Sequence, residues 1–108
     1  MTDFSMGEMQ EMQRKLQDKY KDKWEPIGPE TGKNKLLWMI SEVGEVIDVI
    51  KKNGDERAYE DPEIRAHLVE EAADVLMFYN DFLLCYCISP EELKRSFVEK
   101  FEKNMKRW

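Results

Sequence analysis

Four carboxylates at matched spacing are the residues of this chain best suited to chemistry. Glu42 and Glu45 lie three residues apart in "SEVGEVIDV", and Glu71 and Asp74 repeat that spacing in "EEAADVLMF". Both segments are otherwise largely apolar. Several like charges brought together away from water need a compensating positive charge. The pattern therefore favours a divalent cation, and an all-oxygen ligand set fits Mg²⁺ or Mn²⁺ better than Zn²⁺.

The two acidic segments must face each other if they are to share a cation. Both show the apolar spacing of helices, and an antiparallel hairpin would bring them together. Glu45 and Glu71 then lie eight and nine residues from the connecting turn, which is roughly 12 and 13.5 Å. Glu42 and Asp74 match in the same way, at roughly 16.5 and 18 Å. We therefore expect the four carboxylates at one height between the two helices.

Two other interpretations of the carboxylates stay open. They could form salt bridges with Lys or Arg, or face solvent, as most acidic pairs on helices do. They could also belong to a di-iron bundle, in which two glutamates are each followed three residues later by histidine. The chain has one histidine, His67, and it lies one turn before Glu71. The di-iron interpretation would therefore need ligands from a second, different chain.

Four helices are predicted in one all-α domain that spans residues 1–108. Gly54 follows the second helix as a common stop signal, and Pro62 and Pro90 fit the first turns of the third and fourth. Ser89 and Glu92 form the pattern of a capping box at the fourth helix. The expected helices cover about residues 3–22, 33–53, 61–87 and 89–108.

The apolar faces of the helices indicate a partner subunit. The second helix carries a stripe that we expect to be its core contact, formed by Leu36, Met39, Ile40, Val43, Ile47 and Ile50. In residues 72–88 the strongly polar side chains are limited to Asp74, Asn80 and Asp81. A helix that is apolar almost all round is buried on more than one side. In a chain of 108 residues this predicts that a second copy covers it.

Net charge and the N-terminal sequence limit the partners and the compartment. The net charge of −6 argues against binding to a nucleic acid polymer. Residues 1–15 lack the basic start and apolar core of a signal peptide, and the apolar runs are too interrupted to cross a membrane. We therefore expect a cytoplasmic protein with no membrane partner.

The last helix is basic, in contrast to the acidic middle of the chain. Lys100, Asn104 and Arg107 line one edge of its apolar stripe. Lys and Arg contact phosphate oxygens readily, and an asparagine can bind a sugar or a phosphate. An ordinary solvated basic helix has the same pattern. Beside a metal held by carboxylates, however, cationic side chains are a recurring arrangement for triphosphate chemistry.

These segments together resemble the MazG-like all-alpha nucleoside triphosphate pyrophosphohydrolases, a family that includes dimeric dUTPases and dCTP pyrophosphatases. The resemblance rests on "SEVGEVIDV", "EEAADVLMF" and the closing "KFEKNMKRW", in that order, and extends loosely to Trp24. It implies a four-helix MazG-like bundle completed by homo-oligomerisation, as a dimer or as a tetramer built from dimers. One difference is Ser41, which stands where many members carry another glutamate.

The resemblance also implies an activity and a set of site residues. The activity is cleavage of a nucleoside triphosphate to the monophosphate and pyrophosphate with Mg²⁺, through attack of water at the α-phosphorus. The metal ligands would be Glu42, Glu45, Glu71 and Asp74, with Glu42 or Glu45 orienting the water. Substrate contacts are expected from Trp24, Trp38, Phe78, Lys100, Lys103, Asn104 and Arg107. The alternative is a catalytically idle helical dimer that binds metal and nucleotide as a sensor or a protein-interaction module.

Overall fold

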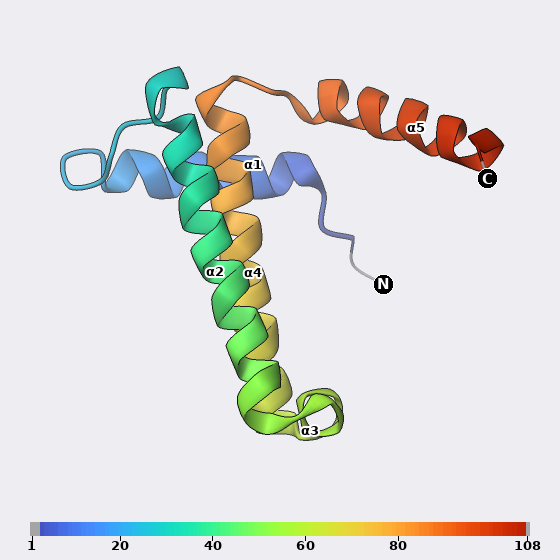
Figure 1. The fold of residues 1–108 in the computed structure, drawn as a ribbon. Coiled ribbons are helices and arrows are strands. Elements are labelled where there is room, and N and C mark those ends of the chain that lie inside the picture. The colour runs from blue at the N-terminus through green and yellow to red at the C-terminus, as the bar shows by residue number, and fades with distance from the viewer. Residues whose placement is uncertain (1–2, 108) are drawn as a thin grey trace.

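The computed structural model describes residues 3–107, and the regular elements in that range are all helical (Figure 1). They follow in the order α1 Met6–Lys19, the 3₁₀ helix η1 Pro29–Thr31, α2 Gly32–Asn53, α3 Asp55–Glu60, α4 Pro62–Cys85 and α5 Pro90–Arg107. The prediction of an all-helical chain is confirmed. Each of the four expected helices is present, and their ends differ from the predicted ones by a few residues.

The centre of the fold is a long antiparallel hairpin of α2 and α4 (Figure 1). Helix α3 lies in the connection between them. Gly54 ends α2 with a φ of 89°, a left-handed value that glycine adopts without strain. Asp61 caps α4, because its carboxylate accepts hydrogen bonds from the backbone N–H groups of Glu63 and Ile64 at 3.0 and 3.3 Å. These local signals set the residue at which α2 ends and the residue at which α4 begins. They therefore also influence which residues of the two helices lie opposite each other.

The face of α2 that packs against α4 coincides only in part with the apolar stripe predicted from the sequence: Leu36, Met39 and Ile50 are half-buried, and the other three residues are exposed. The buried and half-buried positions of α2 include Lys35, Met39, Glu42, Val46 and Val49, and they recur at helical spacing. The predicted core contact was therefore wrong for part of the stripe. Residues Ile40, Val43 and Ile47 are exposed, Ile40 by 61% and Ile47 by 50%. Periodicity finds an apolar face, but it does not say which chain covers that face.

Helix α1 crosses the hairpin at the end opposite to α3 (Figure 1). Its buried side chains are three glutamines at helical spacing, Gln10, Gln13 and Gln17. The amide of Gln10 donates a hydrogen bond of 3.1 Å to the backbone carbonyl of Ile88, which ties α1 to the end of the hairpin. A polar buried face is unusual for a small domain, because buried amides need hydrogen-bond partners. This face of α1 lies against α4 and places Gln13 and Gln17 beside the candidate site described below.

Helix α5 leads away from the hairpin and does not pack along the other described helices (Figure 1). The single chain is consequently not a closed four-helix bundle, and it contains the additional short helix α3. Its radius of gyration is 16.3 Å, whereas a compact domain of this length is expected near roughly 13 Å. Large apolar side chains of α5 stay exposed, namely Phe97, Val98, Phe101 and Met105.

Among the described residues, no single helix is long and apolar enough to cross a membrane. Helices α4 and α5 taken together meet the same criteria of length and composition, but they are bent by 108° relative to each other.

Candidate active site

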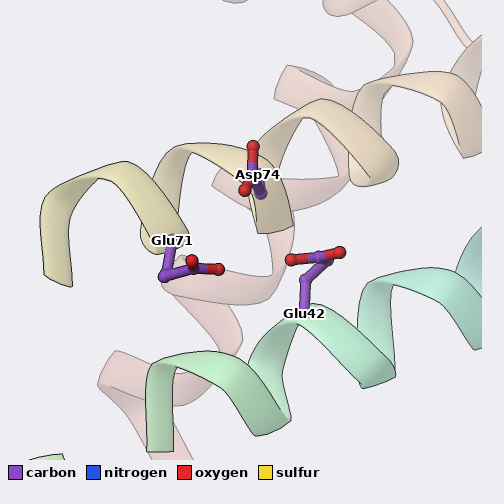
Figure 2. Close-up of side chains that lie close together, drawn as sticks. All are labelled: Glu42, Glu71 and Asp74. Carbon is purple, nitrogen blue, oxygen red and sulfur yellow. The ribbon is translucent and has the colours of Figure 1, made fainter. Parts of the chain in front are cut away.

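Three of the four predicted carboxylates converge between α2 and α4. Glu42 extends from α2 toward Glu71 and Asp74 on α4 (Figure 2). One carboxylate oxygen from each residue lies within 4.8 Å of the others. All three side chains are half-buried, so they are shielded in part from water while still reachable. The predicted meeting of the two acidic segments is therefore present for these three residues.

Glu45 lies outside this group of three. Its side chain is exposed, although its charge is near enough to help raise the pKa of Glu42. Residues three apart are rotated by about 60° around a helix, and on α4 this keeps both Glu71 and Asp74 toward α2, whereas on α2 Glu45 lies beyond the edge of the buried face that includes Glu42, Val46 and Val49. Once Glu42 faces the seam between α2 and α4, Glu45 points toward the edge of that seam. Distance from the turn, which matched the four carboxylates in height, does not include this rotation.

The group of three carboxylates is electrostatically strained. The pKa of Glu42 is raised above its ordinary value, first by desolvation and then by repulsion from Asp74, Glu71 and Glu45. Among the described ion pairs, no Lys or Arg neutralises the group. Its one recorded partner is His67, whose Nε2 lies 3.3 Å from Oε1 of Glu71 on the next turn of α4. The interpretation of these carboxylates as ordinary Lys or Arg salt bridges is therefore not what the structure shows.

The donor set fits a hard divalent cation. Three carboxylates offer oxygen ligands only, and their mutual distances allow one ion to touch all of them. Mg²⁺ and Mn²⁺ accept such ligands and keep several waters, which suits a site that is open on one side. A di-iron centre would require two histidines that follow the glutamates at the proper spacing. The chain has only His67, which precedes Glu71, so the donor set does not match that centre.

The raised pKa of Glu42 predicts a pH-dependent stability. Above its ordinary value of 4.5, the folded chain still binds the proton that the unfolded chain has released. Stability without metal is therefore expected to fall as the pH rises from 4.5 through the raised pKa. Melting temperatures measured in chelator should show a shallower fall for Glu42→Gln than for the wild type, and added Mg²⁺ should offset the wild-type loss. Identical pH slopes for the two proteins would contradict this electrostatic account.

A pocket of about 560 Å³ adjoins the carboxylates and shares Asp74 with them. Its walls contain the three aromatic residues expected to contact a base, Trp24, Trp38 and Phe78. The rings of Trp38 and Phe78 are nearly parallel, with an interplanar angle of 16° and centroids 6.3 Å apart. Trp38 is 57% exposed, which leaves a flat apolar surface available to a ligand. The structure thus brings the predicted aromatic residues together at one pocket.

The inner end of this pocket holds polar residues that the sequence interpretation did not assign to the site. Asp81 and Lys35 are 2% and 5% exposed, and both line the pocket together with Gln13 and Gln17. Burial raises the pKa of Asp81, whereas hydrogen bonding to the two glutamines and the charge of Lys35 act in the opposite direction. The sequence did contain a signal for Asp81, because an aspartate inside an otherwise apolar helix is rarely buried without a partner or a function.

The predicted residues of the last helix are not near the carboxylates within one chain. Helix α5 leads away from the hairpin, and it carries Lys100, Lys103, Asn104 and Arg107 (Figure 1). Lys100 and Lys103 are exposed and border a shallow surface on α5 itself. Asn104 is half-buried, and Arg107 is exposed and makes a contact within the chain. A role for these residues at the carboxylates would require a second copy of the chain.

Comparison with known proteins finds one family model, and the range that it matches includes both acidic segments. A sequence model described as the MazG nucleotide pyrophosphohydrolase domain matches residues 30–107, which include all four carboxylates and helices α2 to α5. Helix α1, with Gln13 and Gln17, lies outside the matched range. No curated protein and no solved structure matches the chain.

Proposed function

We propose that this chain, which belongs to the MazG nucleotide pyrophosphohydrolase family, cleaves a nucleoside triphosphate to the monophosphate and pyrophosphate with Mg²⁺ or Mn²⁺. The family resemblance expected from the sequence is confirmed by the match over residues 30–107, and members of this family are generally nucleoside triphosphate pyrophosphohydrolases. The observation that carries the proposal is the convergence of Glu42, Glu71 and Asp74 at one end of an aromatic pocket.

The residues of the site would have different roles, and each role follows from the position of the residue. Glu42, Glu71 and Asp74 would hold the cation, and the protein shields them only in part, which leaves room for phosphate oxygens. A bound divalent cation supplies positive charge to the triphosphate and lowers the pKa of a coordinated water. His67 contacts Glu71 and would hold that carboxylate in its orientation.

Proton transfer is best assigned to the pair Glu42 and Glu45. Glu42 faces the other carboxylates and Glu45 lies one turn further along α2, so a carboxylate of this pair would lie beside a water held by the cation and could orient it or accept its proton. Glu45 is exposed at the edge of the group, where it would orient a water. The attacked atom would be the α-phosphorus, since pyrophosphate is the expected leaving group.

We propose further that the working form is a homodimer or a tetramer built from dimers. The exposed stripe of α2 and the apolar face of α5 each leave several large apolar side chains exposed, which commonly marks an interaction surface. A second copy would cover the stripe formed by Ile40, Val43 and Ile47. The same assembly would give Lys100 and Asn104 a route to the triphosphate held by a neighbouring copy, where cationic side chains offset phosphate charge.

A pyrophosphate-release assay tests the proposed activity. The purified protein should be incubated with a panel of ribo- and deoxyribonucleoside triphosphates in Mg²⁺, in Mn²⁺ and in excess chelator. We expect pyrophosphate and monophosphate from at least one triphosphate, with no turnover in chelator. Nucleotide binding by calorimetry without turnover on the whole panel would reject the enzyme and favour a sensor.

A further inference from the structure

The residues that line the site form three levels along the hairpin. Glu42 and Asp74 make the acidic level. Trp38 lies four residues before Glu42, and Phe78 lies four residues after Asp74. Because α2 and α4 are antiparallel, both steps lead in the same direction along the hairpin. The aromatic level is therefore about one helical turn, or roughly 6 Å, from the acidic level.

A polar level follows at twice that distance. Lys35 lies seven residues before Glu42, and Asp81 lies seven residues after Asp74. Seven residues correspond to two turns and roughly 10.5 Å, and they return each side chain to nearly the same face of its helix. This separation is comparable with that between the α-phosphorus and the far edge of the base in an extended nucleotide. A triphosphate held at the acidic level would place its base beside the aromatic rings and its edge near Lys35 and Asp81.

The polar level has unused hydrogen-bonding capacity. Oδ1 of Asp81 has no hydrogen-bond partner among the described residues, although the side chain is buried. The described part of the chain holds no ion pair that involves Lys35. Gln13 and Gln17 hydrogen-bond the carboxylate of Asp81, but its buried Oδ1 stays unpaired, and a buried oxygen without a partner is costly and calls for an explanation. A ligand that donates to Oδ1 of Asp81 and accepts from Lys35 would satisfy this oxygen and use the second donor.

We infer that this polar level reads the base and favours cytosine, adenine and guanine, which carry an exocyclic amine, over uracil and thymine. The inference rests on the proposed function, because the triphosphate must be held at the acidic level. An exocyclic amine projects beyond the ring and donates hydrogen bonds, so it complements the carboxylate of Asp81. The ring N–H of uracil or thymine lies between two projecting carbonyl oxygens, and these would face the same negative charge. Lys35 donates to the ring nitrogen that accepts next to the amine in each favoured base.

Binding of non-hydrolysable analogues tests the inference separately from catalysis. The α,β-imido analogues of dCTP and dUTP are matched, because their bases differ only by an amine in place of a carbonyl at position 4 and by the proton on the neighbouring N3. Calorimetry in Mg²⁺ is expected to give a Kd for the dCTP analogue that is roughly ten- to a hundredfold lower. Asp81→Asn should bring the two Kd values close together, because the amide can both donate and accept. Glu25→Gln is the matched control: it neutralises another carboxylate of the pocket and should keep the wild-type ratio.

A second ligand keeps the test decisive if Asp81→Asn does not fold. A dCTP analogue with two methyl groups on its amine has no donor there, and the wild type should bind it about as weakly as the dUTP analogue. Equal wild-type Kd values for the dCTP and dUTP analogues, no binding of either, or an unchanged ratio in folded Asp81→Asn would overturn the inference. Pyrophosphate release without base preference would leave the proposed function standing. Base preference without pyrophosphate release would reject the proposed function and keep the base pocket.

Discussion

Glu42→Gln is expected to lower Mg²⁺-dependent pyrophosphate release by roughly a hundred- to a thousandfold. The amide keeps the shape of the side chain but loses the negative charge that a hard cation requires. The metal-free variant should nevertheless melt at a higher temperature than the wild type, because the desolvation of a charged carboxylate and its repulsion from Asp74 and Glu71 are both removed. Steady-state assays and thermal melts with and without Mg²⁺ measure the two effects on the same preparations.

Glu70→Gln is the matched control for this prediction. It removes the same charge from the residue next to Glu71, on an exposed side of α4 and outside the group of three carboxylates. Its activity and its stabilisation by Mg²⁺ should stay close to wild type. If Glu42→Gln kept its metal-dependent activity, or if Glu70→Gln lost as much, the assignment of the site to Glu42, Glu71 and Asp74 would be wrong.

Ile47→Glu is expected to break the assembly and to remove most activity with it. Ile47 is half exposed in the single chain, so the substitution leaves the hairpin core intact. Losing a buried isoleucine from an interface costs about 1.5–3 kcal/mol, and a two-fold symmetric interface loses it twice. Light scattering should report the mass of one chain, and pyrophosphate release should fall because helix α5 no longer reaches a neighbouring site.

Lys52→Glu provides the comparison for Ile47→Glu. Lys52 is exposed near the end of α2, on a side that the apolar stripe does not occupy, and the substitution also introduces a glutamate. It should leave the mass and the activity near wild type. A wild-type protein that is already monomeric and fully active would reject the proposed assembly.

Local sequence signals were sufficient for the helices and for much of the site. The stop at Gly54 and the cap at Asp61 fixed the ends of the hairpin helices to within a residue or two. With those ends in place, helix geometry predicted that four carboxylates would meet, and the structure groups three of them, Glu42, Glu71 and Asp74, while Glu45 lies outside. Trp38 and Phe78 meet at one pocket for the same reason, since they lie one turn from the acidic level on the same faces, and their contact with a base stays a prediction.

Contacts between distant segments could not be predicted in this way. The surroundings of the polar level depend on α1 crossing the hairpin, and nothing in the spacing of Gln13 and Gln17 indicates where that helix packs. Helix α3 is too short for a periodic pattern to reveal it. The exposure of Ile47 could not be predicted either, because an apolar stripe is equally consistent with a core contact and with an interface between subunits. Each of these features is decided by tertiary or quaternary packing.

The three proposed levels of the site would explain why α2 and α4 carry acidic, aromatic and buried polar residues where they face each other. The seam between α2 and α4 is acidic where a cation would bind, aromatic one turn further on, and polar and buried at the level of Asp81. An apolar seam would bind the two helices more tightly, because buried charges without partners destabilise a fold. The seam therefore gives up stability at the positions that a nucleotide would occupy.

Hydrolysis in water enriched in oxygen-18 tests the central claim most directly. A triphosphate that the protein accepts is cleaved in Mg²⁺, and mass spectrometry identifies the products and the position of the label. Attack at the α-phosphorus predicts labelled monophosphate and unlabelled pyrophosphate, both absent from a parallel reaction in excess chelator. Label in pyrophosphate, release of inorganic phosphate as the first product, or undiminished turnover in chelator would contradict the account.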